Sequence, residues 1–499
     1  MSGAITFLAA AWQNRIGLAI GLAVAGAAAA GPWSPVPPVA AETMGVIALG
    51  LACAIPVLAV AEREEIDIFD LGVAVGIAYF VLFPLRALVV LLGLDAFANP
   101  IVLGAPSMTI RLVLAVTSLG MASGGLAYTA ARRLIPRRAR LPTPAWFDSP
   151  NLALSLGLFA IGIAAQASVL IHYYSPARFA AIGPQSFSVI SELSVLMLAG
   201  LALLARRAAL DTASRPRIAL AFAVAAGVAL GVLGEFKETA VLAVLVPLVV
   251  WRYTSPTGLP WRSILVAALL AAFIIFPTVQ LARHAQLRLR TSNPIAVVQA
   301  LPEEATMYDW RNGSGPQPLP PGELVSFPFL ILTARLYGFD AMTVAVMATP
   351  SRIPYQEGGT LIQLWQGLVP RVLWAGKPNI GLGSWFAANY WAPGSPSAPQ
   401  AMTHPGELWI DFGWPGVVLG LGILGVLYRL LFALLDPIAS PIGAVVYSVV
   451  FSTLIVVDTD IPFVYITLIQ RVVTLACLFV GISLVVRLAK SRGARIGAA

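Results

Sequence analysis

Apolar segments of membrane-spanning length recur along most of this 499-residue chain. Crossing the hydrocarbon core of a bilayer, ~30 Å thick, takes about 20 predominantly apolar residues in a helix. Charged residues make up 11% of the chain and hydrophobic residues 59%, whereas an average soluble domain is roughly 25% charged. We therefore expect an all-α, polytopic integral membrane protein, a helix bundle held in the lipid bilayer.

The predicted bundle has about twelve spans. Their centres lie near Ala23, Ala54, Val81, Gly120, Gly162, Val195, Ala225, Val246, Ala271, Leu421, Val450 and Ala476. The first is short and rich in alanine, and the eighth is short and framed by Glu238 and Arg252, so the expected range is about ten to thirteen. We expect residues 1–282 to form about nine spans, residues 283–412 a large extracytoplasmic loop, and residues 413–499 about three spans and a cytoplasmic tail.

Basic residues gather in stretches that lie outside the apolar spans. These stretches are residues 132–140, 206–217 and 487–495. Short cytoplasmic loops are enriched in lysine and arginine, so we expect both termini in the cytoplasm and residues 283–412 on the opposite face. The clusters also account for the net charge of +8, which therefore does not indicate nucleic-acid binding.

Residues 283–412 form one polar segment between two blocks of apolar helices. The segment holds seven arginines and one lysine against eight acidic residues, so it is neutral overall, with charges spread singly among aromatic side chains. That composition is typical of a concave site in which a few polar groups orient a ligand on an apolar floor. A pump or channel has little use for so long an insertion, whereas an enzyme acting on a lipid-linked substrate at the membrane surface needs one.

Two parts of the polar segment have a local pattern. Apolar residues from Leu324 to Ala348 recur at helical spacing, which predicts a pair of amphipathic or re-entrant helices against the membrane. Proline and glycine dominate from Thr291 to Gly322, which predicts irregular coil. Cys53 and Cys477 lie in apolar spans and the chain has 3 histidines, so neither a disulfide framework nor a metal site is predicted.

The end of the polar segment carries two linked motifs. Residues 370–378 read PR-x-x-W-x-x-KP, and residues 406–413 read GE-x-W-x-x-FG directly before an apolar span. Residues around them that fit the same pattern are Arg335, Asp340, Gly358, Gly383, Tyr390 and Gly416. In this order they resemble the Wzy-type oligosaccharide repeat-unit polymerases, the O-antigen and exopolysaccharide polymerases of bacterial envelopes. The chain departs from the pattern at Ala375 and Gly376, where an acidic residue or proline is common, and at Asp411, where asparagine is usual.

The resemblance implies a GT-C-like, metal-independent glycosyltransferase of the bacterial inner membrane that requires no cofactor. Its donor and its acceptor would both be polyprenyl-diphosphate-linked oligosaccharides, joined on the periplasmic face, with a chain-length regulator and a flippase as further partners. An O-antigen ligase, which passes finished glycan to another acceptor by the same chemistry, is the closest alternative. A flippase or transporter of lipid-linked oligosaccharide is a third class, but it would not need the long insertion.

Transfer from a polyprenyl diphosphate needs cations that stabilise the leaving group. Arg371 and Arg335 are the first candidates and Lys377 the third, because arginine grips phosphate oxygens with a planar fork and lysine adds a compact charge. Further candidates at the ends of spans are Lys237, Arg283, Arg288 and Arg290. The alternatives are structural: Arg335 pairs with Asp340, Lys237 pairs with a neighbouring glutamate, and the remaining cations contact lipid headgroups.

The reaction also needs a group that takes the proton from the acceptor hydroxyl. Glu407 is the first candidate, because it precedes the apolar span that starts near Gly413 and is therefore expected at the membrane surface. His404 is the second, since O-antigen ligases are thought to use a loop histidine. The alternatives are that Glu407 satisfies backbone N–H groups at a helix N-terminus and that His404 is a hydrogen-bonded loop residue.

Aromatic side chains of the motif region are candidates for stacking on sugar rings. They are Trp374, Tyr390 and Trp409. Aromatic residues also gather at membrane interfaces without binding sugar, which is the alternative. Asp458 and Asp460 precede the last span, but two carboxylates without a third ligand do not predict a metal, and we expect none.

Overall fold

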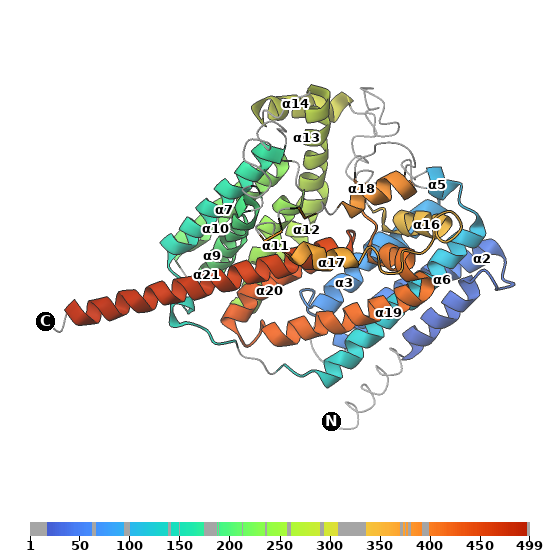
Figure 1. Ribbon diagram of the computed structural model, residues 1–499, viewed down its shortest axis with the longest axis horizontal. Coiled ribbons are helices and arrows are strands. Elements are labelled where there is room, and N and C mark those ends of the chain that lie inside the picture. The colour runs from blue at the N-terminus through green and yellow to red at the C-terminus, as the bar shows by residue number, and fades with distance from the viewer. Residues whose placement is uncertain are drawn as a thin grey trace.

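Helices make up the fold in the computed structural model (Figure 1), and no strand occurs among the residues that it describes. These are residues 17–61, 66–93, 100–137, 141–148, 150–173, 187, 189–211, 213–234, 237–256, 261–289, 294–307, 336–369, 373–374, 376–377, 381–391 and 399–496. The helices before the polar segment, with the last one entering it, are α2 (Pro38–Ala61), α3 (Leu71–Phe80), α4 (Arg86–Leu91), α5 (Pro100–Leu103), α6 (Ser107–Leu134), α7 (Leu152–Tyr173), α9 (Val195–Leu210), α10 (Ser214–Leu233), α11 (Lys237–Thr254), α12 (Trp261–Leu270) and α13 (Phe276–Leu289). The later ones are α14 (Pro294–Met307), α16 (Gly338–Ala348), α17 (Ile362–Leu368), α18 (Leu382–Phe386), α19 (His404–Leu435), α20 (Pro441–Leu454) and α21 (Ile461–Ile496).

In the described part of the chain, nine helical segments are long and apolar enough to cross a membrane. They are Pro38–Ala61, Leu71–Leu91, Ser107–Leu134, Leu152–Leu170, Val189–Leu210, Ser214–Leu233, Ile264–Arg283, His404–Leu435 and Ile461–Ala489. Each coincides with a predicted span, so the all-α, multi-pass membrane class is confirmed. The predicted spans near Ala23, Val246 and Val450 are helices as well, at Gly17–Ala30, α11 and α20. The first and last of these three are shorter than the ~30 Å core of a bilayer requires.

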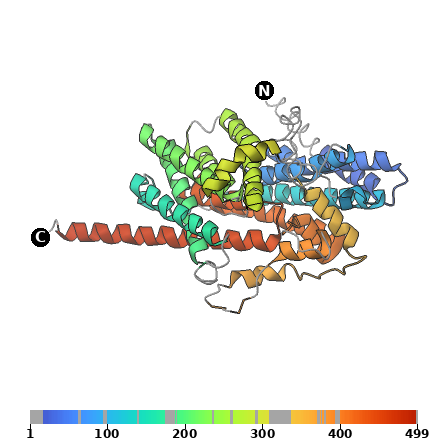
Figure 2. The same ribbon diagram turned by 90° about the horizontal axis from the view of Figure 1, so that it is seen from above.

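The helices form two groups that lie side by side (Figures 1 and 2). In one group α6 packs against α2 and α19, and α3 packs against α2. In the other, α9 packs against α7 and α11, and α10 packs against α11. α20 contacts α11, α9 and α21, while the C-terminal part of α21 extends beyond the other helices (Figure 2).

Glycine allows α6 and α19 to approach closely. A side chain added at Gly425 would have its first carbon 2.2 Å from the carbonyl oxygen of Gly124, and one at Gly120 would lie 2.6 Å from Val417. Without a hydrophobic drive between helices in lipid, small residues supply stability by letting backbones come into van der Waals contact. The contact between these two helices positions the candidate site, because α19 carries it.

Valine in place of Gly425 is expected to destabilise the protein by about 1–3 kcal/mol, the usual cost of overpacking a core. The matched control is Gly481→Val in α21, where an added side chain meets no atom within 4 Å. Apparent melting temperatures of the purified variants in detergent measure the difference. Equal melting temperatures for the two variants would contradict the close approach of α6 and α19.

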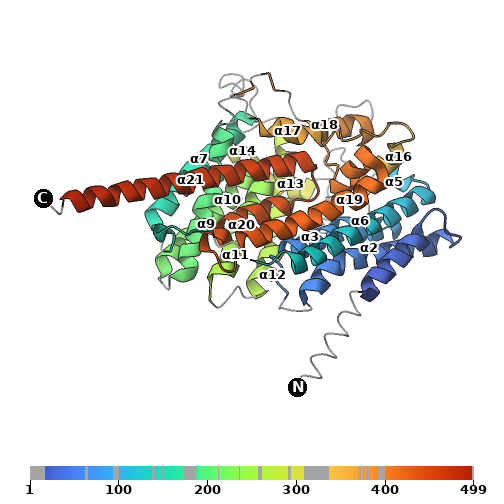
Figure 3. The ribbon, with the colours of Figure 1, turned by 60° about the horizontal axis from the view of Figure 1, so that its bottom comes forward.

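The polar segment contains more helix than expected. α14 spans Pro294–Met307, so the coil predicted from Thr291 to Gly322 is wrong over these residues. Proline is favourable at the first helical position, and the AVVQAL and EEA runs that follow include good helix formers. Of the helix pair predicted from Leu324 to Ala348, the structure describes α16, whereas residues 308–335 lie outside its described part. Figure 3 shows α17 and α18 on the same side of the bundle as α16.

α19 bends sharply at Gly413. This residue has φ 66° and ψ −153°, a conformation that is essentially restricted to glycine. The carbonyl oxygen of Leu408 lies 2.4 Å from where a Gly416 side chain would begin, although a straight helix would separate these residues by about 12 Å. The bend sets apart a short arm, His404–Phe412, which packs back on the start of the longer part of α19.

Candidate functional site

The arm carries a stripe of titratable side chains. His404, Glu407 and Asp411 follow one another at i, i+3 and i+7, the spacing of one helix face. Their exposed fractions are 0%, 0% and 1%. The arm begins at a capped end, where Thr403 Oγ1 accepts the N–H of Gly406 at 3.3 Å. The local structure therefore directs this polar face into the protein.

Two distant segments of the chain hold Glu407. The Thr360 hydroxyl oxygen lies 2.8 Å from Glu407 Oε1, and the Ile461 N–H donates to Oε2 at 2.6 Å. Ile461 is the first residue of α21, so this carboxylate binds a backbone N–H group at a helix start, that of α21. Glu407 is enclosed by protein, at the meeting point of the arm, α21 and the turn around Thr360.

Asp411 shares the same hydroxyl with Glu407. Asp411 Oδ2 lies 2.6 Å from Thr360 Oγ1, and Oδ1 accepts the Thr360 N–H at 3.3 Å. A hydroxyl donates only one hydrogen but also accepts. Both short contacts are therefore hydrogen bonds only if one of the two carboxyl groups carries a proton. We call Glu407 and Asp411 the carboxyl pair; on this accounting it holds at least one proton.

A turn at residues 355–361 closes over the arm. The N–H groups of Gln356 and Glu357 donate to the carbonyl oxygens of Ile410 and Asp411, each at 3.0 Å. These bonds satisfy carbonyls at the end of the arm that the bend at Gly413 leaves without intrahelical partners. The turn thereby places Thr360 against the carboxyl pair.

Glycines of the resemblance motif lie where this turn and the arm touch. Gly358 has φ +89°, and a side chain there would begin 3.1 Å from the Phe412 ring. A side chain at Gly413 would begin 2.9 Å from the Tyr355 hydroxyl. Gly416, as described above, faces the carbonyl of Leu408. Positive φ angles therefore favour glycine at Gly358 and Gly413, and contact with a backbone carbonyl requires it at Gly416.

His404 is hydrogen-bonded into the bundle. Its Nδ1 lies 3.0 Å from the Tyr79 hydroxyl of α3, and the two rings meet edge-on with centroids 6.4 Å apart. Its Nε2 is buried and has no hydrogen-bond partner among the described residues. The imidazole is therefore hydrogen-bonded through Nδ1, and Nε2 has no hydrogen bond to the described residues.

A buried ion pair ties the polar segment to the membrane helices. Arg86 donates to both carboxylate oxygens of Asp340, from Nε at 3.2 Å and from Nη2 at 2.6 Å. The side chains are each 2% exposed. This pairing explains a charge inside a predicted span and gives Asp340 a partner 254 positions away, whereas Arg335, the partner suggested by the sequence, lies outside the described residues.

Replacing either Arg86 or Asp340 by leucine should lower stability by about 3 kcal/mol, because each change strands one buried charge without its two-point partner. The double variant Arg86→Leu/Asp340→Leu should recover most of the loss, since an apolar pair can replace a buried ion pair. A double-mutant cycle compares the melting temperatures of the unmodified protein, the two single variants and the double variant. Additive losses in the double variant would show that the two side chains do not act as a pair.

The proposed diphosphate-binding cations are only partly described. Those outside the described residues are Arg371, Arg335 and Arg290. Lys237 is the first residue of α11, but its side chain lies outside the described part. Arg283 is half-buried near the end of α13. Arg288 binds Glu303 at 3.1 Å and also Glu304, whose hydrogen bond raises the pKa of the guanidinium. Arg288 therefore links α13 to α14 and already has two acidic partners.

Lys377 is hydrogen-bonded to the end of α17. Its Nζ donates to the carbonyl oxygens of Gly367 at 2.8 Å and Val369 at 2.9 Å, and its N–H donates to the carbonyl of Trp374 at 3.1 Å. The ammonium group thus binds the end of α17, on the chain just before Arg371. The ammonium group of Lys377 therefore already has two backbone acceptors.

The three aromatic candidates differ in their surroundings. Tyr390 and Trp409 are buried and converge on Thr349: the Tyr390 hydroxyl lies 2.8 Å from its Oγ1, and Trp409 Nε1–H donates to its carbonyl at 3.1 Å. Burial raises the pKa of the Tyr390 hydroxyl. Both rings therefore stabilise the fold around the arm. Trp374 is half-buried and is the one of the three with a partly open ring.

Asp460 is a third carboxylate near Glu407. Its Oδ1 accepts the Phe463 N–H at 2.8 Å in the first turn of α21, and burial raises the pKa of this carboxyl. Among the described residues no group of three His, Cys, Asp or Glu side chains has an arrangement that could hold a metal ion. Asp460 thus serves as a cap of α21.

Sequence reasoning missed Thr360 and Tyr79, the partners of the two proposed proton-transfer residues. Thr360 follows Gly358 and Gly359, a turn signal that predicts the bend but not its contact. Tyr79 lies in an apolar span with no local signal at all. Comparison with protein-family models, curated proteins and solved structures finds no match for this chain.

Proposed function

We propose that the chain is a glycosyltransferase that joins polyprenyl-diphosphate-linked oligosaccharide repeat units at the outer face of the bacterial inner membrane. The carboxyl pair carries this proposal. Glu407 and Asp411 both belong to the segment that resembles the Wzy-type polymerases, and they meet on the Thr360 hydroxyl within a membrane helix bundle. Buried carboxyl groups that share a proton suit proton transfer from an acceptor hydroxyl.

In the proposed reaction the acceptor hydroxyl attacks the anomeric carbon of the donor sugar. A C–O bond forms at that carbon, and the bond between that carbon and the diphosphate oxygen breaks with its electron pair. The acceptor proton passes to the carboxyl pair in its singly ionised form. The polyprenyl diphosphate departs with its negative charge, which Arg371 would stabilise.

Access to the carboxyl pair requires the turn at residues 355–361 to move, because Glu407 is fully buried beneath it. Tyr355, Phe412 and Trp414 beside the turn are 37%, 45% and 61% exposed. Aromatic side chains with nearby polar groups are typical of ligand sites. They support an acceptor site on this exposed side of the turn.

Deletion of the gene, followed by gel analysis of surface polysaccharide, tests the class of activity. A polymerase predicts surface glycan of a single repeat unit and the loss of long chains. Full-length chains that accumulate on carrier lipid would instead favour the ligase. Repeat units trapped on the cytoplasmic side would favour the flippase and remove the proposed chemistry.

Cysteine labelling tests the proposed orientation. Cys53 and Cys477 are first replaced, because Cys477 is exposed. A cysteine at Gly315 should then react with a membrane-impermeant thiol reagent in intact spheroplasts, whereas one at Pro136, beside the arginine cluster, should react only after lysis. The reverse labelling would mean that the bundle has the opposite orientation in the membrane. The carboxyl pair would then lie on the cytoplasmic side, away from the lipid-linked acceptors.

A further inference from the structure

A groove lies beside α21, where this helix faces the loop that follows the arginine-rich end of α6. Its volume is about 650 Å³, within the ~300–1,000 Å³ that is usual for small-ligand sites. One wall is a face of α21 on which the lining residues recur in steps of three or four, and these include Val472, Ala476, Val480, Ser483 and Arg487. At about 1.5 Å of rise per residue this face extends over ~22 Å. That length exceeds the hydrocarbon of one leaflet, which is half of the ~30 Å core of a bilayer.

The facing wall of the groove is held in place by contacts within the protein. Its residues come from the end of α19, from α20 and from the loop, and they are Leu435, Ile442, Val446 and residues 141–144. Directly after these loop residues, Trp146 Nε1–H donates to Ser483 Oγ at 3.0 Å. The Phe147 ring meets Phe479 edge-on with centroids 5.4 Å apart, and Arg206 Nε donates to the Phe147 carbonyl oxygen at 3.0 Å. The loop is therefore fixed against both α21 and α9.

Along α21 the lining of the groove changes from apolar to basic. It begins at Val472 and Ala476 and ends at Arg487. Arg487 is exposed, and its guanidinium group has no hydrogen bond or ion pair with another described residue. Two other arginines of the cytoplasmic clusters and their surroundings do have partners: Arg207 pairs with Asp211 at 3.0 Å, and Arg429 donates to the Ile135 carbonyl oxygen at 3.0 Å. An apolar groove that ends at an unpaired cation matches a molecule with an apolar chain and an anionic head.

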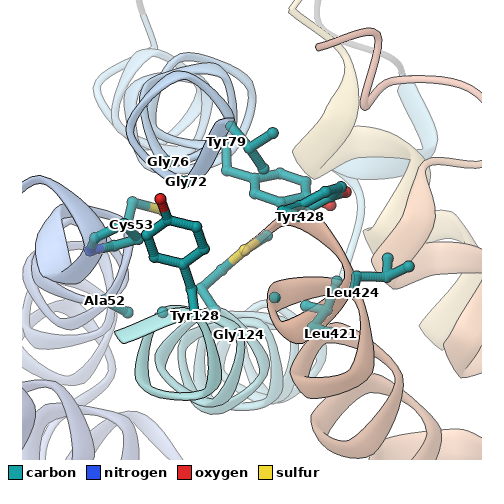
Figure 4. A pocket seen from close by; sticks show the side chains of 15 residues that line it. Ala52, Cys53, Gly72, Gly76, Tyr79, Gly124, Tyr128, Leu421, Leu424 and Tyr428 are labelled. Atoms are coloured by element: carbon teal, nitrogen blue, oxygen red, sulfur yellow. The ribbon is translucent and has the colours of Figure 1, made fainter. Parts of the chain in front are cut away.

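Two other cavities in the described part of the chain lack this combination. The one among α2, α3, α6 and α19 (Figure 4) is lined chiefly by apolar residues and glycine. Its volume of about 40 Å³ is far too small for a lipid chain. The other, of about 270 Å³, lies among α3, α11, α12 and α20 and has no charged residue in its lining. The groove beside α21 is both larger and charged at one end.

We propose that this groove binds an anionic phospholipid of the cytoplasmic leaflet, with an acyl chain along α21 and the phosphate at Arg487. Arginine suits a phosphate because its planar fork contacts two oxygens at once. Basic pockets between membrane helices on the cytoplasmic side are typical sites for anionic headgroups, and the arginine clusters predict that this end of the bundle is cytoplasmic. The sequence adds further basic residues at 132–140 and 487–495, which favour an anionic over a zwitterionic lipid.

Lipid titration tests the headgroup site. Phosphatidylglycerol or phosphatidylcholine with the same chains is added to delipidated protein in detergent, and bound lipid is counted by native mass spectrometry. One phosphatidylglycerol should bind more tightly than phosphatidylcholine, and Arg487→Ala should weaken it roughly 5- to 100-fold, from the value of one basic residue at a membrane surface to that of a charge-assisted hydrogen bond. The matched control is Arg133→Ala, at an exposed arginine in the last turn of α6 that does not line the groove. Equal losses in the two variants, or equal affinity for the two lipids, would overturn the proposal.

A second pair of variants tests the chain site. Ala476→Trp fills the groove and should weaken phosphatidylglycerol at least as much as Arg487→Ala does. Cys477→Trp adds the same bulk at the next position, which is exposed and does not line the groove, and should bind normally. Glycerophosphoglycerol, the same headgroup without chains, should not displace the lipid. Displacement by this headgroup, or equal binding by the two tryptophan variants, would show that the groove holds no acyl chain.

Crosslinking of the unmodified protein does not depend on how the variants fold. Phosphatidylglycerol with a photoreactive diazirine in its acyl chain is added to the protein in phosphatidylcholine nanodiscs, which are then illuminated. The label should mark Val446 and Val472 in the groove in preference to Phe222, which is 73% exposed on α10. Equal marking of Phe222 and the groove would mean bulk lipid only and no site. All of these measurements are made without lipid-linked sugar, so their failure would leave the proposed transferase activity untouched.

Discussion

Replacing Glu407 by glutamine lowers repeat-unit joining by roughly 100- to 10,000-fold, the range that a positioned proton-transfer group contributes. The fold survives because glutamine keeps both contacts: its carbonyl oxygen accepts the Ile461 N–H, and its amide N–H donates to Thr360 Oγ1. Only the capacity to take up a proton is lost. The measurement is the joining rate of purified protein supplied with lipid-linked repeat units, alongside the melting temperature of the variant.

Two further variants show whether the effect belongs to Glu407. Thr360→Ser retains the shared hydroxyl and should keep most of the activity, which controls for disturbance of the turn. His404→Ala should reduce the rate less than Glu407→Gln does. If His404→Ala abolishes transfer while Glu407→Gln is active, the histidine becomes the base and the ligase alternative gains weight.

Changing Arg371 to lysine lowers transfer by roughly 30- to 1,000-fold, equivalent to ~2–4 kcal/mol of lost transition-state stabilisation. Lysine keeps the charge but loses the planar fork that contacts two phosphate oxygens at once. The matched control is Arg352→Lys, at an exposed arginine that donates to the Asn389 carbonyl at 2.8 Å, and its rate should not change. Near-normal polymer from correctly inserted Arg371→Ala protein would remove Arg371 from the site.

The class of the fold could be predicted because burial in lipid leaves a direct signal in composition. The spans centred on Gly120 and Leu421 correspond to α6 and α19. Hydropathy does not report which spans touch, however, and the contact of Gly124 with Gly425 depends on the identity of single residues in three dimensions. The coil predicted after Thr291 failed for a local reason, since a proline at the start of α14 was counted as a helix breaker.

The candidate site could be predicted as a region but not as a set of contacts. Glu407 lies 47 positions from Thr360, and His404 lies 325 positions from Tyr79, so no local pattern joins them. In the sequence Asp411 stands out only as a departure from the motif. Its link to Glu407 depends on the Thr360 hydroxyl, which comes from another segment. Such couplings arise from tertiary packing alone.

The hydrogen bond from the Ile461 backbone to Glu407 sets an order of events during synthesis. A nascent chain that has delivered α19 to the membrane carries a carboxylate whose N–H donor is still inside the ribosome, several dozen residues behind. Only the arrival of α21 satisfies that oxygen, and an unpaired polar group in the bilayer is costly. A chain that ends before α21 therefore leaves Glu407 Oε2 without its backbone donor.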